Sequence, residues 1–215
     1  SMGIDETNRC LDHQSPSSAV GQLGFCECLF VTKETDSVGE KNIKDTIVFY
    51  NHAQQFTFAR PKTPYSTDSA VICFPHHFYS DDRPNPDEGL IRVTMLGDYQ
   101  FWLETKKNNP ALYKHKKQEL ALAAQSILQK VYPQLKLEIL FQDVFTPASI
   151  ERYTGHTNGA IYGSPEKIKT GLTSTKNLYI IGTDQGFLGV IGATLSGISI
   201  ANQYGVMATA TGGLS

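Results

Sequence analysis

The chain has 215 residues, of which 40% are hydrophobic and 19% charged, as in an ordinary folded globular protein. This composition excludes disorder over most of the length, and the length suffices for one large domain or a domain and part of a second. The formal net charge of −2 gives no basic footprint for nucleic acid. No run of about 18 apolar residues, as a membrane-spanning helix needs, occurs in the sequence.

The first residues are polar and rich in Ser, Pro and Gly over positions 1–24. The start Ser1-Met2-Gly3 is not followed by the apolar run of a signal peptide and resembles a cloning remnant before an internal start. We therefore expect that the natural N-terminus is absent and that its targeting signals cannot be read here.

Four cysteines, at positions 10, 26, 28 and 73, lack the CxxC or His spacing of a zinc site, so no metal is expected. Cys26 and Cys28 alternate, and a strand would place both sulfurs on one face. Reduced, packed thiols are the expected state. The pair His76-His77 follows an apolar run and is interpreted as surface or loop rather than as a catalytic base.

Short apolar runs bounded by turn residues begin at Phe25 and predict strands. They cover residues 25–32, 46–50, 70–75, 90–96 and 135–144. Between the last two runs, Pro110 to Val131 predicts a helix, because Pro is at its start and an apolar stripe recurs at helical spacing. This order predicts an α+β fold in which helices pack on a mainly antiparallel sheet.

The last quarter of the chain has a different pattern. Residues 177–182 (NLYIIG) form a continuous apolar run, which is typical of a strand buried on both faces in a parallel sheet. A Gly-rich connection over 183–192 leads to a predicted helix over 193–204. In that helix Ala193, Gly197 and Ala201 recur every four residues and form a face without bulk.

Such a strand–turn–helix unit has the features of one side of a ligand site. The unpaired N–H groups near residues 190–193, at the helix N-terminus, would suit an anionic or electron-rich ligand edge. Asp184 would accept hydrogen bonds from ligand hydroxyls. Each feature alone also has a plain structural explanation, such as a turn, a cap or close helix packing. No GxGxxG occurs in the chain, so these residues do not make a complete dinucleotide site.

The segment 177–202 resembles the C-terminal flavin-binding motif of the phytoene desaturase, carotenoid isomerase and retinol-saturase-like family of FAD-dependent oxidoreductases. In that family a buried strand ends in Gly-Asp, whereas here Thr183 stands between Gly182 and Asp184. Residues 145–155 and 158–163 also resemble the family, in which a strand end with Thr-Pro leads to an aromatic-Gly segment facing the flavin. The resemblance is specific over 144–204 and diffuse over 25–143.

The resemblance implies a two-part architecture. Residues 25–165 would form a substrate-binding domain after the N-terminal segment 1–24. Residues 166–205 would be the C-terminal strand–turn–helix of a Rossmann-like FAD domain, followed by a tail over 206–215. A missing N-terminal half would carry the GxGxxG loop and hold the ADP portion of FAD.

The resemblance also implies two sets of site residues, with no catalytic residue assigned. Cofactor contacts would come from Gly182, Asp184, Gly189, Val190, Ile191, Gly192, Ala193 and Gly197. The substrate or the flavin face would meet Tyr153, Asn158, Gly159, Ala160 and Tyr162.

The expected function is that of an FAD-dependent oxidoreductase, which desaturates, isomerises or saturates a carotenoid or other apolar isoprenoid by hydride transfer through the flavin. This piece alone would be inactive. An apolar small molecule is the expected partner, and the expected location is cytoplasmic, with peripheral membrane contact left open. Two alternatives remain. An amine-oxidase-like flavoenzyme would show an aromatic cage with a buried carboxylate, and a non-enzymatic lipid-binding or interaction domain would show a closed core that covers the C-terminal helix.

Overall fold

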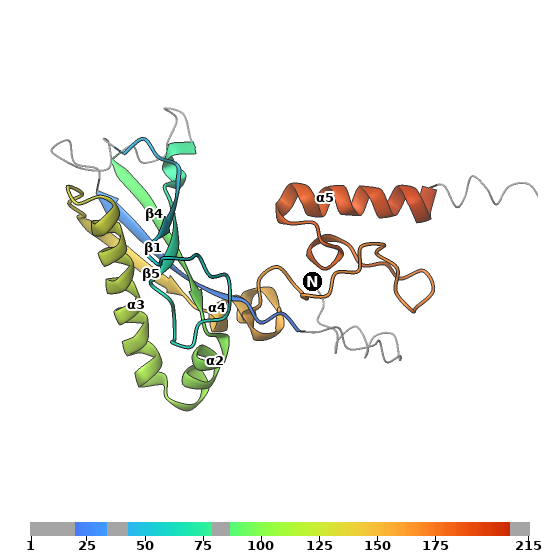
Figure 1. Cartoon of the computed structure of the whole chain (residues 1–215), viewed down its shortest axis with the longest axis horizontal. Coiled ribbons are helices and arrows are strands. Elements are labelled where there is room, and N and C mark those ends of the chain that lie inside the picture. Colours follow the sequence, from blue (N-terminus) through green and yellow to red (C-terminus); the bar gives the residue numbers. More distant parts are fainter. Residues whose placement is uncertain (1–19, 34–42, 79–86, 207–215) are drawn as a thin grey trace, which may run out of the picture.

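The computed structural model describes residues 20–33, 43–78 and 87–206, and within them it has an α+β fold (Figure 1). Five strands form one sheet, in the order β2-β3-β4-β1-β5, and every pairing is antiparallel. The strands are β1 (Gly24–Lys33), β2 (Ile47–Asn51), β3 (Ser69–Cys73), β4 (Glu88–Gly97) and β5 (Ile139–Phe145). Each overlaps one of the predicted runs, so the five predicted strands and their antiparallel arrangement are confirmed.

The helix α3 (Pro110–Val131) covers one face of this sheet (Figure 1). Alternate residues of β1 are buried on that face, among them Cys26, Cys28 and Phe30. The Cys28 thiol donates a hydrogen bond to the Leu120 carbonyl of α3 at 3.7 Å. The predicted helix and the shared face of the two cysteines are therefore confirmed, and the core lies between α3 and the sheet.

A second helix, α2 (Tyr99–Asn108), precedes α3 and was not predicted. The Asp98 side chain caps it by accepting a hydrogen bond from the Gln100 amide. Its only large apolar core residue is Trp102, whose indole N–H donates to the Pro64 carbonyl at 2.8 Å. α2 has ten residues, fewer than the window of about 11–18 residues over which apolar periodicity indicates a helix, so the sequence pattern did not indicate it.

The predicted buried strand over 177–182 is wrong. Its apolar residues are half-buried or exposed, and the Ile180 amide donates to the Gly171 carbonyl in a loop. In this segment one isolated bridge, between Tyr179 and Leu172, is all the strand pairing that the described residues show. Gly182 then begins a short 3-10 helix, Gly182–Gln185. A strand requires neighbours to pair with its backbone, and the described part of the chain supplies none here.

Two further boundaries differ from the prediction. After the strand end at Phe145, the Thr-Pro segment folds as helix α4 (Pro147–Thr154), capped reciprocally by Thr146 and Ser149. The C-terminal helix α5 (Gly189–Ile200) begins four residues before the predicted start at 193 and continues as a π-turn over Ala201–Val206. Figure 1 shows α5 apart from α3, with the sheet between them. Among the described residues, no helix combines the length and apolar character needed to cross a membrane.

Candidate functional site

An open cleft of about 770 Å³ lies between the β2–β3 loop and the segment that leads into α5. Its walls are mainly apolar and include two lysine side chains. The lining residues are Phe58, Tyr162, Lys167, Lys169, Gln185, Gly186, Phe187 and Leu188. Gln185, Gly186, Phe187 and Leu188 belong to the segment 177–202 that resembles the flavin-binding motif (the flavin-like motif), so the cleft borders this motif.

Three aromatic rings join this cleft to the sheet. Phe25 of β1 meets Tyr162 edge to face, with ring centroids 5.9 Å apart, and Phe58 at 6.4 Å. The ring centroids of Phe58 and Tyr162 are 6.3 Å apart. The Ile161 amide donates to the Leu23 carbonyl at 3.0 Å, which ties the backbone before Tyr162 to the start of β1. The predicted flavin-face residue Tyr162 is thus held at the junction of the sheet and the C-terminal segment.

The other four predicted flavin-face residues do not line the cleft. Tyr153 is exposed on α4. Asn158 adopts a positive φ of 62°, and its backbone N–H donates to the Glu151 carboxylate at 3.2 Å. Gly159 and Ala160 are buried, and a Cβ on Gly159 would clash with the Pro147 carbonyl. Asn158, Gly159 and Ala160 therefore shape the turn after α4, and the close approach at Gly159 explains its glycine.

Asp184 holds the loop that follows Tyr162. Its Oδ1 accepts a hydrogen bond from the Ser164 amide at 2.6 Å, and its backbone carbonyl accepts one from the Ile168 amide at 2.9 Å. A Cβ on Gly163, which has a φ of 65°, would clash with the same carboxylate. One oxygen of Asp184 therefore binds the chain itself, and the predicted contact with ligand hydroxyls stays a prediction for the other.

The small residues of α5 let it approach the preceding segment closely. A Cβ on Gly182 would lie 3.7 Å from the Ala193 methyl, and one on Gly197 would lie 3.8 Å from Ile181 Cδ1. A Cβ on Gly192 would lie 3.2 Å from the Phe187 carbonyl carbon. Packing against residues 181–187 therefore accounts for the glycine at 192, while a Cβ at Gly197 would make only an ordinary van der Waals contact.

Sequence reasoning missed a buried polar pair beneath this contact. The Ser196 hydroxyl accepts from the Gly182 amide at 2.7 Å and donates to the Gln185 side-chain carbonyl. The Gln185 amide donates in turn to the Lys169 carbonyl at 3.0 Å. The sequence carries no clear signal for this pair, because α5 also carries Thr194 and Ser199 and only the packing shows which hydroxyl is buried.

The first turn of α5 is open. Gly189 adopts a φ of 71°, and no heavy atom would lie within 4 Å of an added Cβ. Val190 and Ile191 are 85% and 78% exposed, and Leu188 at the N-cap position makes no side-chain cap. The amides of this turn can therefore face a ligand or another part of the protein.

The face of the sheet that points away from α3 is also largely apolar. Strand alternation places the following side chains on it: Phe25, Leu29 and Val31 of β1, Ile47 and Phe49 of β2, Val71 of β3, Leu90 of β4 and Phe141 of β5. We call this set, with the side chains between its members, the outer face.

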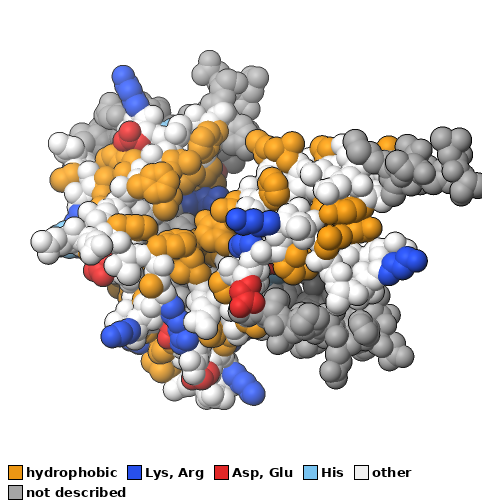
Figure 2. Space-filling model, turned by 45° about the vertical axis from the view of Figure 1, so that its right-hand side comes forward, with side chains coloured by type: hydrophobic (Ala, Val, Ile, Leu, Met, Phe, Trp, Pro, Cys, Tyr) orange, Lys and Arg blue, Asp and Glu red, His pale blue; other side chains and the backbone are white. Residues whose placement is uncertain are grey.

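Phe58 of the β2–β3 loop and Tyr162 cover the end of the outer face at Phe25. No helix of the described part of the chain covers the rest, and Phe49 is 81% exposed. Figure 2 shows hydrophobic side chains spread over one side of the molecule, with Lys and Arg side chains between them. An antiparallel sheet normally turns polar residues to water, so an apolar outer face indicates a surface that meets a ligand or another part of the protein.

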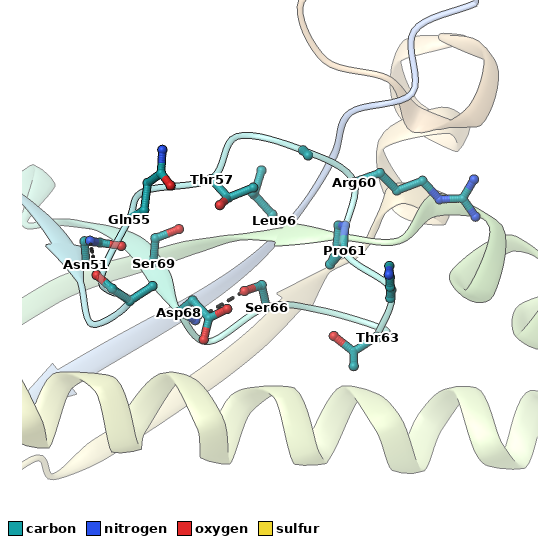
Figure 3. Close-up of a pocket in the computed structure, with 13 residues that line it drawn as sticks. Asn51, Gln55, Thr57, Arg60, Pro61, Thr63, Ser66, Asp68, Ser69 and Leu96 are labelled. Atoms are coloured by element: carbon teal, nitrogen blue, oxygen red, sulfur yellow. Dashed lines mark hydrogen bonds between the residues drawn. The ribbon is translucent and has the colours of Figure 1, made fainter.

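A second, smaller hollow of about 240 Å³ lies inside the β2–β3 loop and is lined mostly by polar residues (Figure 3). Arg60 fastens this loop to α2: its Nε donates to Asp98 at 2.7 Å and its Nη2 to Gln100 at 2.9 Å. The Asp68 amide donates to the Ser66 hydroxyl at 3.2 Å. These hydrogen bonds hold the β2–β3 loop, which carries Phe58, in place against α2.

His76 lies in the connection between β3 and β4, within the surface-or-loop expectation, but it is buried there. Its Nδ1 accepts a hydrogen bond from the Leu90 amide at 3.0 Å. It packs between a short 3-10 helix and β4, where a polar partner is available from the strand. No group of three or more His, Cys, Asp or Glu side chains in the described ranges is arranged to hold a metal ion.

Comparison with known proteins gives a partial likeness. The chain is similar to the all-trans-retinol 13,14-reductase of Danio rerio, with 28% identity over an alignment of 136 residues that covers 55% of this chain and 22% of that protein. The match therefore spans about a fifth of the length of this curated relative. No family model matches the chain.

Proposed function

We propose that the chain is the C-terminal part of an FAD-dependent oxidoreductase that acts on an apolar isoprenoid. The observation that carries this proposal is the apolar outer face of the sheet, which meets the cleft beside the flavin-like motif through Phe25, Phe58 and Tyr162. The likeness to a retinol reductase supports it, because retinol is an isoprenoid alcohol with a long apolar chain.

FAD would supply the hydride transfer when bound, and this chain would supply position and a dry surface. The residues present fit one edge of a flavin. The first turn of α5 has amides without a side-chain cap and a partial positive charge, which suit an electron-rich ring edge. Gly189 leaves open space beside that turn. Tyr162 and Leu188 would border the ring system from the cleft.

The exposed side of α5 would meet the rest of the FAD domain in the complete protein. Val190, Ile191, Leu195 and Ile198 are all exposed apolar residues on this helix. Side chains of this kind in such number mark a surface that is covered by another element. The assignment of residues 166–205 to a Rossmann-like FAD domain is part of this proposal, with a loop at 177–182 in place of the expected strand.

The two alternatives find less support in the described residues. A non-enzymatic domain was expected to cover its C-terminal helix, and α5 is exposed on most positions. An amine oxidase was expected to show an aromatic cage with a buried carboxylate. Near the aromatic cluster the carboxylate of Glu27 is already paired with Arg92 and Thr94.

The test is purification of the complete protein with measurement of its flavin content by absorbance after acid release. The flavoprotein is then incubated without oxygen with all-trans-retinol and, separately, with phytoene, and the masses of the products are measured by mass spectrometry. A bound flavin and a product that has gained or lost two hydrogen atoms would support the proposal. A protein that folds yet binds no flavin would refute it.

A further inference from the structure

One ion pair interrupts the apolar outer face of the sheet. Arg92 of β4 grips Glu27 of β1 with two parallel hydrogen bonds, Nε to Oε1 at 3.0 Å and Nη2 to Oε2 at 2.6 Å. The Thr94 hydroxyl donates to the same Oε2 at 3.0 Å. Glu27 lies directly opposite Thr94 in the antiparallel register, so Arg92 reaches it diagonally. Two-point contact fixes the orientation of both side chains.

This ion pair lies among apolar residues and near the cleft. Phe25, which carries the aromatic cluster, is two residues before Glu27 on the same strand face, about 7 Å away along β1. Leu29 follows on the other side, and Val71 lies across β4 on the same face. The Glu27 side chain is 22% exposed and that of Arg92 44%, so a ligand on the outer face can reach both.

The chemistry of the pair favours a neutral partner that can both donate and accept. The hydrogen bond to Glu27 raises the pKa of Arg92, so the guanidinium stays charged. Glu27 retains accepting capacity beyond its three bonds, and Arg92 retains N–H donors beyond its two. A hydroxyl group can donate to the carboxylate and accept from the guanidinium. A ligand carboxylate can only accept and is repelled by Glu27, and a hydrocarbon would desolvate the pair without replacing its water.

Building on the proposed function, we propose that Glu27 and Arg92 bind the terminal hydroxyl of an isoprenoid alcohol. The apolar chain of this ligand would run along the outer face past Phe25 toward the cleft. The pair then determines specificity: it selects the alcohol over the corresponding acid and over the hydrocarbon.

The first experiment compares three ligands on the complete flavin-containing protein. All-trans-retinol, all-trans-retinoic acid and axerophthene, the hydrocarbon without the hydroxyl, are titrated by isothermal titration calorimetry. Retinol should bind at least about tenfold more tightly than either of the others, as expected for hydrogen bonds to charged groups. Equal affinities for the three ligands would overturn the inference.

The second experiment reverses the selectivity. Glu27→Gln removes the repelling charge and keeps an acceptor, so the affinity for retinoic acid relative to retinol should rise about tenfold. The matched control is Glu138→Gln, which removes a carboxylate from another ion pair to β1, with Lys33 at 3.7 Å. The control should leave the ratio of the two affinities unchanged. If Glu27→Gln loses its flavin or has a lower melting temperature, Arg92→Lys is used instead. This variant keeps the positive charge but loses the two-point hydrogen bonding to Glu27. It should reduce the ratio of retinol affinity to retinoic acid affinity about fivefold.

The outcomes separate this inference from the proposed function. A flavoprotein that binds all three ligands alike, with no response to Glu27→Gln or Arg92→Lys, would refute the role of the pair and leave the apolar substrate class standing. A flavoprotein that binds none of the three would refute both the retinoid ligand and the role of the pair. That second result would mean that the outer face is covered by another part of the protein.

Discussion

Phe25 on β1 and Tyr162 in the segment before α5 meet edge to face, with ring centroids 5.9 Å apart. These residues are far apart in sequence, and their contact joins the outer face of the sheet to the cleft beside the flavin-like motif. The backbone of Tyr162 has a φ of 67°, a conformation that L-residues adopt at some cost. The ring contact helps to hold this conformation, because a T-shaped aromatic pair is worth about 0.5–1.5 kcal/mol beyond its buried area.

We expect Tyr162→Ala to destabilise the protein more than Tyr162→Gly. Both variants lose the ring contacts with Phe25 and Phe58, and alanine alone keeps the strain of a positive φ. The free energies of unfolding should differ by about 1 kcal/mol in favour of glycine. Urea denaturation of the two variants measures this difference. Equal stability would mean that the left-handed conformation is not retained in solution.

Gly197→Leu should block flavin binding in the complete protein without unfolding it. A Cβ at this position meets Ile181 at 3.8 Å, so the leucine branch has to extend along the small-residue face. Gly189→Val should have the same effect and also strain the backbone, since φ is 71° there. Flavin content and circular dichroism are measured together.

The control for the helix substitutions is Gly205→Leu. An added Cβ at Gly205 has no heavy atom within 4 Å, and this position lies after α5. Its flavin content should match that of the unchanged protein. Full flavin content in Gly197→Leu would show that the small face of α5 lies away from the cofactor.

Asp184→Ala should loosen the segment that follows Tyr162. The substitution removes the acceptor of the Ser164 amide, a hydrogen bond of 2.6 Å, and should cost about 1–3 kcal/mol of stability. Asp184→Asn keeps an acceptor oxygen and should retain most of it. Amide hydrogen exchange at Ser164 separates the two variants. Unchanged exchange in Asp184→Ala would mean that the carboxylate serves a ligand instead of this loop.

Alkaline pH should destabilise the fold through its buried thiols. Burial raises the pKa of Cys28 from its ordinary value of 9.0 to about 12, and burial raises that of Cys26 in the same direction. Because the folded pKa is the higher one, this contribution is complete below pH 9 and is lost as pH rises toward 12. The free energy of unfolding should therefore fall by about 1.4 kcal/mol per pH unit for each thiol in this window. Cys28→Ala should show a shallower slope in urea denaturation between pH 9 and 10.5, and an unchanged slope would contradict the assignment.

The sequence by itself determined the local elements that carry their own signal. The spacing of Cys26 and Cys28, two residues apart in a predicted strand, fixed the face that they share, since side chains on a strand alternate. The stripe in α3 and its starting proline fixed that helix and its bounds, because the period of 3.6 residues and the cap lie within one segment. The site residues that the resemblance to the flavin-binding motif implied were likewise taken from contiguous stretches of the sequence.

Only the tertiary structure decided the features that need a partner from elsewhere in the chain. The apolar run at 177–182 lacked a neighbouring strand among the described residues and became a loop, because a strand is stabilised by pairing that its own sequence does not supply. Glu27 and Arg92 are 65 positions apart, and the register of β1 against β4 brought them together. A slip of one residue by either strand would turn its member of the pair to the α3 side, so this pair on the outer face depends on the packed sheet and not on any local pattern.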